Sequence, residues 1–272
     1  MRKNIPPSAL ARDDRFNRID TEQRMSDLRN TMVVGHVDPE AEDVADRARR
    51  RMHGIFVGEI QALEGAGRTA YDFSTDEVPY ELKLDMARQC WDEARHCEIS
   101  VKLAEHMGGE LGEYAEFTTL FEAACHKDAV FRLAGVNRAL EGLAIDVFTQ
   151  MREFGQAMGD PVLEYCEDYM LADEVTHVKM GSRWLREVTE NDAERRKEAL
   201  AFQRIVDGLF NFRGQRGEDE ASPIRLAREF RKMAGFTDGE VDDIADMAAE
   251  SRAETEAARM AADVNAELAD AQ

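Results

Sequence analysis

The chain has 272 residues, and its 56 acidic against 35 basic side chains give a formal net charge of -21. This balance argues against nucleic acid as a partner, because phosphate binding needs clustered lysine and arginine, and equally against an anionic membrane face. No apolar run approaches the roughly 20 residues of a membrane span, and residues 1–10 lack the apolar stretch of a secretory signal. Four cysteines without CxxC spacing are typical of reduced thiols, so we expect a cytoplasmic protein.

Six prolines and 7% aromatic residues, in a chain rich in Ala, Glu, Leu, Arg and Met, predict an all-α fold. Residues 1–37 have only a thin apolar pattern, and we interpret them as an N-terminal arm. A first helix is expected from Asp38, a good N-cap followed by proline, to about residue 73. A second helix is expected over 79–107, and the two glycines that follow it are an end signal.

A third helix is predicted over 128–158 and a fourth over 161–188, separated by Gly159 and Asp160. Short connections after the first and third helices make antiparallel neighbours, whereas about 20 residues connect the second helix to the third. This pattern is that of a ferritin-like four-helix bundle with one long crossover, which we place at 38–190. The remaining residues, 191–272, are interpreted as a C-terminal helical extension with helices at about 192–212, 223–234 and 238–268.

Two short motifs carry the functional signal. Glu93 and His96 interrupt the apolar stripe of the second helix, and Glu174 and His177 interrupt that of the fourth. Residues three apart lie on one helix face, so each pair directs a carboxylate and an imidazole to the same point. A single Glu-x-x-His motif is weak evidence in a chain this rich in glutamate, so the other two helices decide the interpretation.

Each of those two helices adds one carboxylate. Glu59 lies on the apolar face of the first helix and Glu141 on that of the third, at near-equal intervals before the two motifs. One Glu from each of two helices and Glu-x-x-His from each of the other two is the ligand set of di-iron and di-manganese carboxylate bundles. Two divalent cations balance four buried carboxylates, and oxygen and imidazole donors without thiolate suit iron or manganese. The competing interpretation is that these six residues are surface charges or ordinary ion-pair partners on helices.

The first-helix ligand has an alternative. The sequence Ala-Leu-Glu-Gly occurs at 62–65 and again at 139–142, which would make Glu64 the counterpart of Glu141. Glu64 lies about 140° around the helix from Glu59, so both cannot face the same metal pair. We prefer Glu59, because its interval to the following Glu-x-x-His motif matches the interval in the second half of the chain.

The residues around these ligands resemble known proteins. Residues 56–62 are similar to the first metal-binding helix of rubrerythrin-type proteins. Residues 92–96 and 173–185 resemble a bacterial ferritin-like family of unknown function, which is distantly similar to the tRNA-modifying hydroxylases of the ferritin-like superfamily. The resemblance implies a di-iron centre that reacts with dioxygen or peroxide. The metal ligands it implies are Glu59, Glu93, His96, Glu141, Glu174 and His177.

On this basis we expect an oxidoreductase, a di-iron oxygenase or oxidase that acts on a small organic substrate, with Mn/Fe and Mn/Mn pairs left open. The expected partners are the substrate, dioxygen and an external electron donor, because no CxxC rubredoxin module is present. A homodimer is also left open. The alternative function is non-catalytic iron handling, as a ferroxidase or storage protein, although the extra C-terminal helices argue against a ferritin cage. A third possibility is a metal-free helical interaction protein.

Overall fold

The computed structural model of the chain describes residues 44–114, 126–211 and 226–247, and every regular element within them is helical. The prediction of an all-α fold is therefore confirmed for this part of the chain. The helices are α2 (Val44–Asp72), α3 (Tyr80–His106), α5 (Ala129–Arg132), η3 (Leu133–Leu140), α6 (Glu141–Met158), α7 (Pro161–Val188), α8 (Ala193–Asn211) and α9 (Arg228–Met233), followed by a helical stretch at 238–247. The arm expected at residues 1–37 lies outside the described residues.

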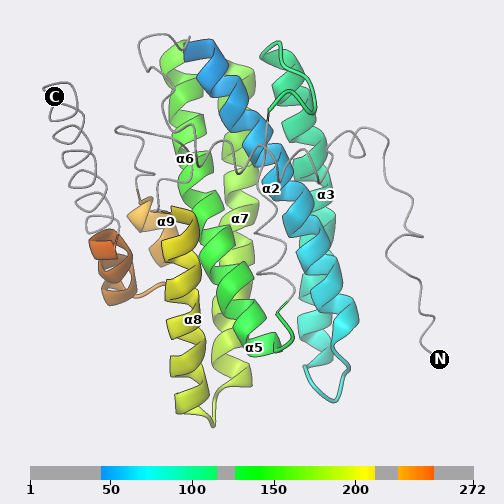
Figure 1. The fold of residues 1–272 in the computed structure, drawn as a ribbon, viewed down its shortest axis with the longest axis vertical. Helices are drawn as coiled ribbons and strands as arrows, with labels where there is room; N and C mark the ends of the chain where they lie inside the picture. The colour runs from blue at the N-terminus through cyan, green and yellow to red at the C-terminus, as the bar shows by residue number, and fades with distance from the viewer. Residues whose placement is uncertain (1–43, 115–125, 212–225, 248–272) are drawn as a thin grey trace, which may run out of the picture.

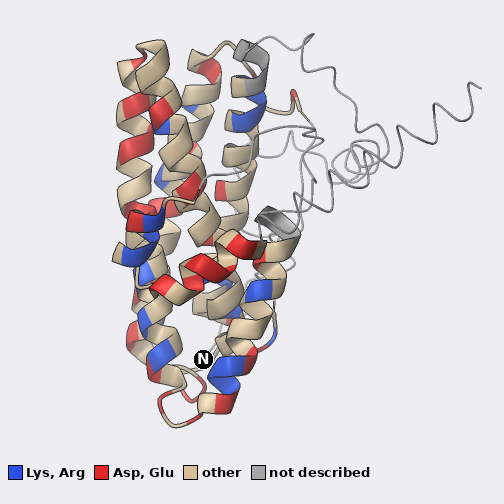
Figure 2. Ribbon diagram, turned by 90° about the vertical axis from the view of Figure 1, so that its left-hand side faces the viewer, with Lys and Arg blue, Asp and Glu red and all other residues tan. Residues whose placement is uncertain are grey.

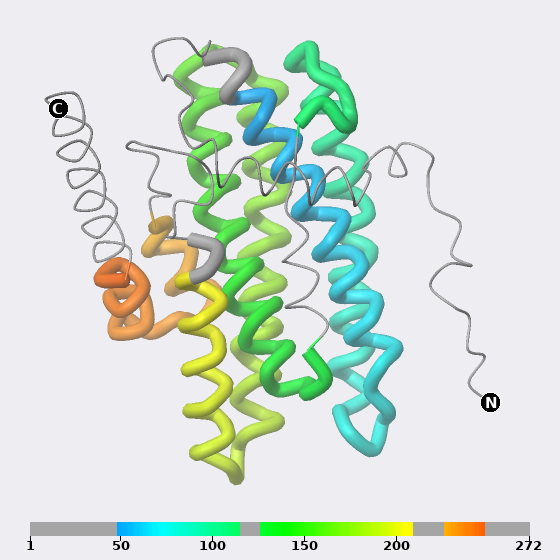
Figure 3. The backbone as a smooth tube through the Cα atoms, viewed as in Figure 1, coloured from blue at the N-terminus to red at the C-terminus, as the bar shows by residue number. Residues whose placement is uncertain are grey.

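The long helices lie side by side and form two hairpins (Figure 1). One hairpin joins α2 to α3, and the other joins the continuous run of α5, η3 and α6 to α7, as the chain path in Figure 3 shows. The second hairpin turns at Gly159, whose φ of 66° lies in the left-handed region that glycine favours. Asp160 then caps α7 by accepting hydrogen bonds from the backbone N–H groups of Val162 and Leu163. Helix α7 therefore has the predicted bounds.

The third long helix differs from the regular α-helix expected over 128–158. Its middle segment, η3, is a π-helix, in which backbone hydrogen bonds run from residue i to i+5 and the turns are wider. The π-helical segment ends at Leu140, so Glu141 is the first residue of the α-helix that follows. Short π-helical segments often occur at functional sites, and this one directly precedes Glu141.

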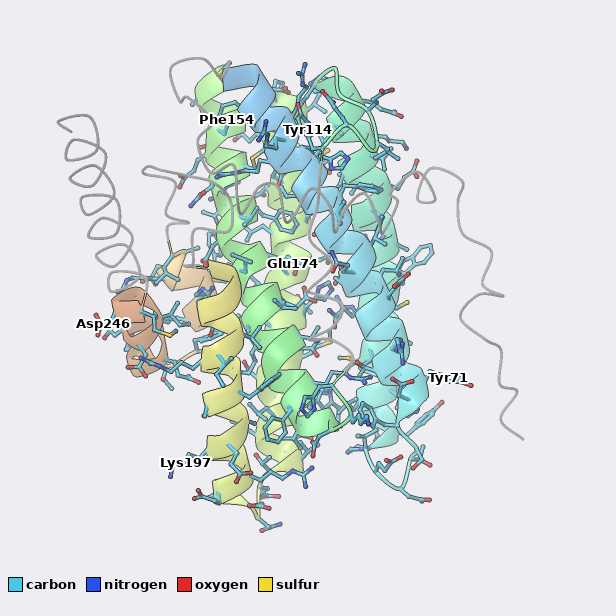
Figure 4. The ribbon with its side chains drawn as sticks, viewed as in Figure 1. Tyr71, Tyr114, Phe154, Glu174, Lys197 and Asp246 are labelled. Atoms are coloured by element: carbon cyan, nitrogen blue, oxygen red, sulfur yellow. The ribbon has the colours of Figure 1, made fainter. Side chains whose placement is uncertain are left out.

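The interior between the hairpins is apolar at both ends and polar in the middle. The largest apolar cluster includes Met52, Leu103, Phe148 and Met170, which come from four different helices. A smaller cluster around Leu82 fills the other end. Between them the described residues bury a set of carboxylates and imidazoles at the level where Figure 4 labels Glu174.

The helices after residue 190 pack on the second hairpin. Helix α8 lies along η3, and α9 contacts α6 and α7 (Figure 1). Arg231 of α9 is fully buried and forms a salt bridge of 2.6 Å with Asp146 of α6. The helix expected at 223–234 is shorter than predicted, since α9 covers only six residues, and the helix expected at 238–268 is observed from 238 to 247. The rest of that prediction lies outside the described residues.

Acidic and basic residues are interspersed along the helices (Figure 2). Some of them form ion pairs, such as Arg152 with Asp168 at 2.7 Å and Arg228 with Asp242 at 2.6 Å. Exposed pairs of this kind contribute about 0–1 kcal/mol each, so the surface charge does not explain the fold. Among the described helices, none has an apolar stretch long enough to span a membrane.

Candidate metal centre

The six residues singled out in the sequence converge in the middle of the bundle. They come from four helices and are all buried, with exposed fractions between 0% and 5%. Their ligand atoms form two groups, and within each group all atoms lie within 4.8 Å of one another. The first group is Glu59, Glu93, His96 and Glu174, and the second is Glu93, Glu141, Glu174 and His177. Two neighbouring sites therefore share two carboxylates, and the interpretation of these residues as surface charges is wrong.

Local helix geometry explains this convergence. Residues three apart share a helix face, so each Glu-x-x-His motif presents both side chains to the interior. Helices η3 and α7 also approach each other unusually closely at Gly181, one turn after His177. A Cβ atom at Gly181 would lie 2.4 Å from Cβ of Asn137, so only glycine fits there. This close approach lies four residues after His177 on α7 and four residues before Glu141 on the neighbouring helix.

Both imidazoles direct Nδ1 toward the carboxylates. His96 Nδ1 lies 3.2 Å from Glu59 Oε2, 3.1 Å from Glu93 Oε2 and 3.2 Å from Glu174 Oε1. His177 Nδ1 lies 3.1 Å from Glu93 Oε1 and 3.5 Å from Glu174 Oε1. Because Glu141 Oε2 lies 3.9 Å from His177 Nδ1, each Nδ1 atom faces one oxygen from each of the three carboxylates of its own group, and these donors could hold a metal ion between them.

The opposite nitrogen of each imidazole contacts an aspartate from the other motif helix. His96 Nε2 lies 3.3 Å from Asp173 Oδ2, and His177 Nε2 lies 3.3 Å from Asp92 Oδ2. Arg95 connects the two aspartates by donating to both. A carboxylate behind a metal-binding histidine fixes the ring orientation and leaves Nδ1 free to bind. The sequence carried a signal for these aspartates, because each directly precedes the glutamate of its motif.

Amide side chains orient the carboxylates near His177. Asn137 Nδ2 donates to Gln89 Oε1 at 2.6 Å, and Gln89 Nε2 donates to Glu141 Oε1 at 2.7 Å and to Glu93 Oε1 at 3.1 Å. All of these residues are buried. Sequence reasoning missed Gln89, because a glutamine on an apolar stripe does not reveal which carboxylate it will contact across the bundle.

The buried carboxylates of the cluster strongly favour a positive charge close to them. Burial raises the pKa of Glu59 and of Glu141 well above the usual range, and the neighbouring carboxylates raise both further. Burial alone would also raise the pKa of Glu93, but the adjacent imidazoles lower it below its usual range. Burial alone would lower the pKa of His177, yet the surrounding carboxylates raise it far above its ordinary value. Without a cation, protons on the imidazoles therefore supply the charge that the carboxylates need.

Several buried atoms of the cluster have incomplete hydrogen bonding. Neither Glu174 oxygen nor His177 Nδ1 has a hydrogen-bond partner among the described residues, although Glu174 Oε1 lies 3.2 Å from His96 Nδ1. Buried polar atoms normally have partners, and these point into the group of ligand atoms. Oxygen and imidazole donors of this number and burial can hold a metal ion.

The choice between the two glutamates of α2 is also visible. Glu59 belongs to the first group of ligand atoms, whereas Glu64 is half-buried and belongs to neither group.

The described cysteines are free thiols, and burial raises the pKa of Cys97 beside the cluster, so its thiol stays protonated. Among the described residues, the candidate metal ligands of both groups are thus carboxylates and imidazoles.

Comparison with known proteins adds a family but no activity. No curated protein and no solved structure has a significant match to the chain. A family model described as "Protein of unknown function (DUF455)" matches residues 20–242, which include all six cluster residues and both aspartates behind the histidines. Because the match covers most of the sequence, the chain belongs to this family.

Proposed function

We propose that the protein is a di-iron oxidoreductase with a ferritin-like four-helix bundle, and that the six clustered residues hold two metal ions. The observation that carries this proposal is that both groups of ligand atoms contain Glu93 and Glu174. Shared carboxylates hold two ions close together, whereas isolated structural sites have separate ligands. One group would be completed by Glu59 and His96, and the other by Glu141 and His177.

Charge balance supports two divalent ions. Four buried carboxylates carry four negative charges, and burial of unpaired charge is strongly unfavourable. Two divalent cations neutralise these charges and leave the imidazoles neutral, as metal coordination by Nδ1 requires. The absence of thiolate from both groups favours iron or manganese over softer ions.

The protein's own residues would fix the geometry of such a pair. Asp173 and Asp92 orient the imidazoles through Nε2, and Gln89 holds Glu141 by a hydrogen bond of 2.7 Å. The apolar residues at both ends of the cluster keep bulk water away from it. When bound, a pair of iron ions would supply the redox chemistry needed to activate dioxygen or peroxide.

The reaction class that we propose for such a centre is redox chemistry. We infer oxidation or oxygenation of a small organic substrate, with dioxygen as co-substrate and an external electron donor to return the metals to the ferrous state. The C-terminal helices α8 and α9 pack on the bundle, and they favour an enzyme over a ferroxidase or storage protein because such helices would have to be accommodated in a closed cage.

Metal analysis after anaerobic reconstitution with ferrous iron tests the proposal. We expect two iron ions for each chain, consumption of dioxygen on exposure to air, and a monomer or homodimer in sizing chromatography. A chain that retains no iron or manganese would overturn the proposal, and a large closed assembly would favour storage.

A further inference from the structure

Helix α7 buries a carboxyl group that belongs to neither group of ligand atoms. Glu167 lies two turns before Glu174 and is 0% exposed. Neither of its oxygens has a hydrogen-bond partner in the described part of the chain. A buried polar group without a partner lowers the stability of the fold, and the metal site proposed above has no use for it.

The position of Glu167 is on the His96 side of the centre. Leu163 and Met170 are its neighbours on the same face of α7, and both belong to the largest apolar cluster. Met170 contacts the hydroxyl of Ser100, which lies one turn beyond His96 on α3. Burial raises the pKa of Glu167 well above the usual range, although His96 acts in the opposite direction. Burial in these apolar surroundings therefore favours the neutral, protonated form of this carboxyl group.

The opposite side of the centre is arranged differently. Met86 precedes Glu93 by seven residues, as Glu167 precedes Glu174, so a methionine replaces the acid there. Gln89 occupies the place that corresponds to Met170, and its amide is fully used by Asn137 and two carboxylates of the cluster. The polar side chain that precedes the motif on the His177 side thus has its hydrogen bonds within the protein, whereas the acid on the His96 side has no partner among the described residues.

We propose that Glu167 is a ligand-binding residue whose carboxyl group donates a hydrogen bond to a small molecule bound beside His96, so that this side of the centre receives the reactant. The ligand class that fits is a compact molecule with an oxygen or nitrogen atom that accepts a hydrogen bond. The hydroxyl of Ser100, which donates to Met170 Sδ at 3.9 Å, lies on the same side. This inference rests on the proposed metal centre, since the ligand lies between that centre and Glu167.

Azide binding to the iron-loaded protein tests the assignment, because azide is a compact anion that accepts hydrogen bonds. Titration calorimetry would compare the wild type with Glu167→Gln, which keeps an N–H donor, and Glu167→Leu, which has none. Loss of a hydrogen bond to a charged ligand should weaken azide binding roughly tenfold or more in Glu167→Leu. Glu167→Gln should bind azide within a few-fold of the wild type, and both variants should hold two iron ions.

Met86→Leu is the matched control on the other side of the centre, and it should leave azide affinity unchanged. Equal affinity of wild type and Glu167→Leu, with full iron content, would overturn this inference but not the metal centre. Failure of the wild type to bind iron would overturn the proposed function itself. Glu167→Leu should also melt at a higher temperature than the wild type without metal, because it removes an unpaired polar group. A lower melting temperature would show a structural role for the acid and would also overturn the inference.

Discussion

The two overlapping groups of ligand atoms predict that the four glutamates are not equivalent in metal binding. Glu93 and Glu174 belong to both groups, whereas Glu59 and Glu141 belong to one group each. Replacing either shared carboxylate with glutamine removes a ligand from both sites. Replacing Glu59 or Glu141 with glutamine leaves all four donor residues of the other site intact. We therefore expect near-complete loss of metal in the first pair of variants and retention of about one ion in the second pair.

The expected effect on stability can be worked out from binding linkage. A site filled at a free-ion concentration a hundredfold above its dissociation constant adds about 2.7 kcal/mol to the free energy of unfolding. For a chain of this size, that amount raises the melting temperature by about 5–11 °C for each filled site. Each variant is compared with its own metal-free form, so that direct effects of the substitution on the fold cancel.

The predicted difference between shared and unshared carboxylates can be tested by two independent measurements, the metal content of each variant and the metal-induced change in its melting temperature. The shift should be largest in the wild type, about half as large in Glu59→Gln and Glu141→Gln, and near zero in Glu93→Gln and Glu174→Gln. Equal losses in all four variants would refute the assignment of shared and unshared carboxylates. Full metal content in Glu93→Gln would refute the position of the site.

Two further predictions concern the residues that join α8 and α9 to the bundle. Asp146→Ala leaves Arg231 buried without its 2.6 Å partner and should lower the free energy of unfolding by about 3–5 kcal/mol, whereas Asp168→Ala, at an exposed pair, should cost about 0–1 kcal/mol in the same urea titration. Similar costs for both would contradict the burial of the first pair. Burial raises the pKa of Asp207 from 3.8 to about 6, so the folded protein binds a proton that the unfolded chain has lost between about pH 4 and 6. The stability of the wild type relative to Asp207→Asn should therefore fall by about 3 kcal/mol as the pH rises through this range, and a constant difference would show that Asp207 titrates normally.

Much of the fold could be predicted, because the residues near the helix ends indicate where the helices begin and end. Asp160 and the proline after it set the start of α7, and Gly159 ends α6 in a left-handed conformation. The π-helical segment η3 was not predicted, because its residues have ordinary helical preferences and its wider turns depend on packing against α7 and α8. Tertiary contact, and not local preference, decides the hydrogen-bond pattern there.

The candidate site could be predicted to the level of the inward-facing residues. Helix periodicity identifies a polar residue that interrupts an apolar stripe, and it found all six members of the cluster. It does not identify contacts between helices, so the roles of Asp92, Asp173 and Gln89 became visible only in the structure. Glu167 was missed for the same reason, because a glutamate on a helix rich in glutamate does not indicate that it will be buried without a partner.

The two halves of the chain contribute similar residues to the cluster, so few positions can make its two sides react differently. Each half supplies one glutamate and one Asp-Glu-x-x-His motif, and each histidine contacts the aspartate of the other half at the same distance of 3.3 Å. Two ions bound in such surroundings would be nearly equivalent, so their ligands alone cannot direct a substrate to one side. The two halves differ one or two turns before the shared glutamates. Gln89 on α3 corresponds to Met170 on α7, and Met86 on α3 corresponds to Glu167 on α7. On the inference above, the unpaired acid Glu167, which has a methionine as its counterpart on α3, is the side chain that would direct a single reactant to the His96 side.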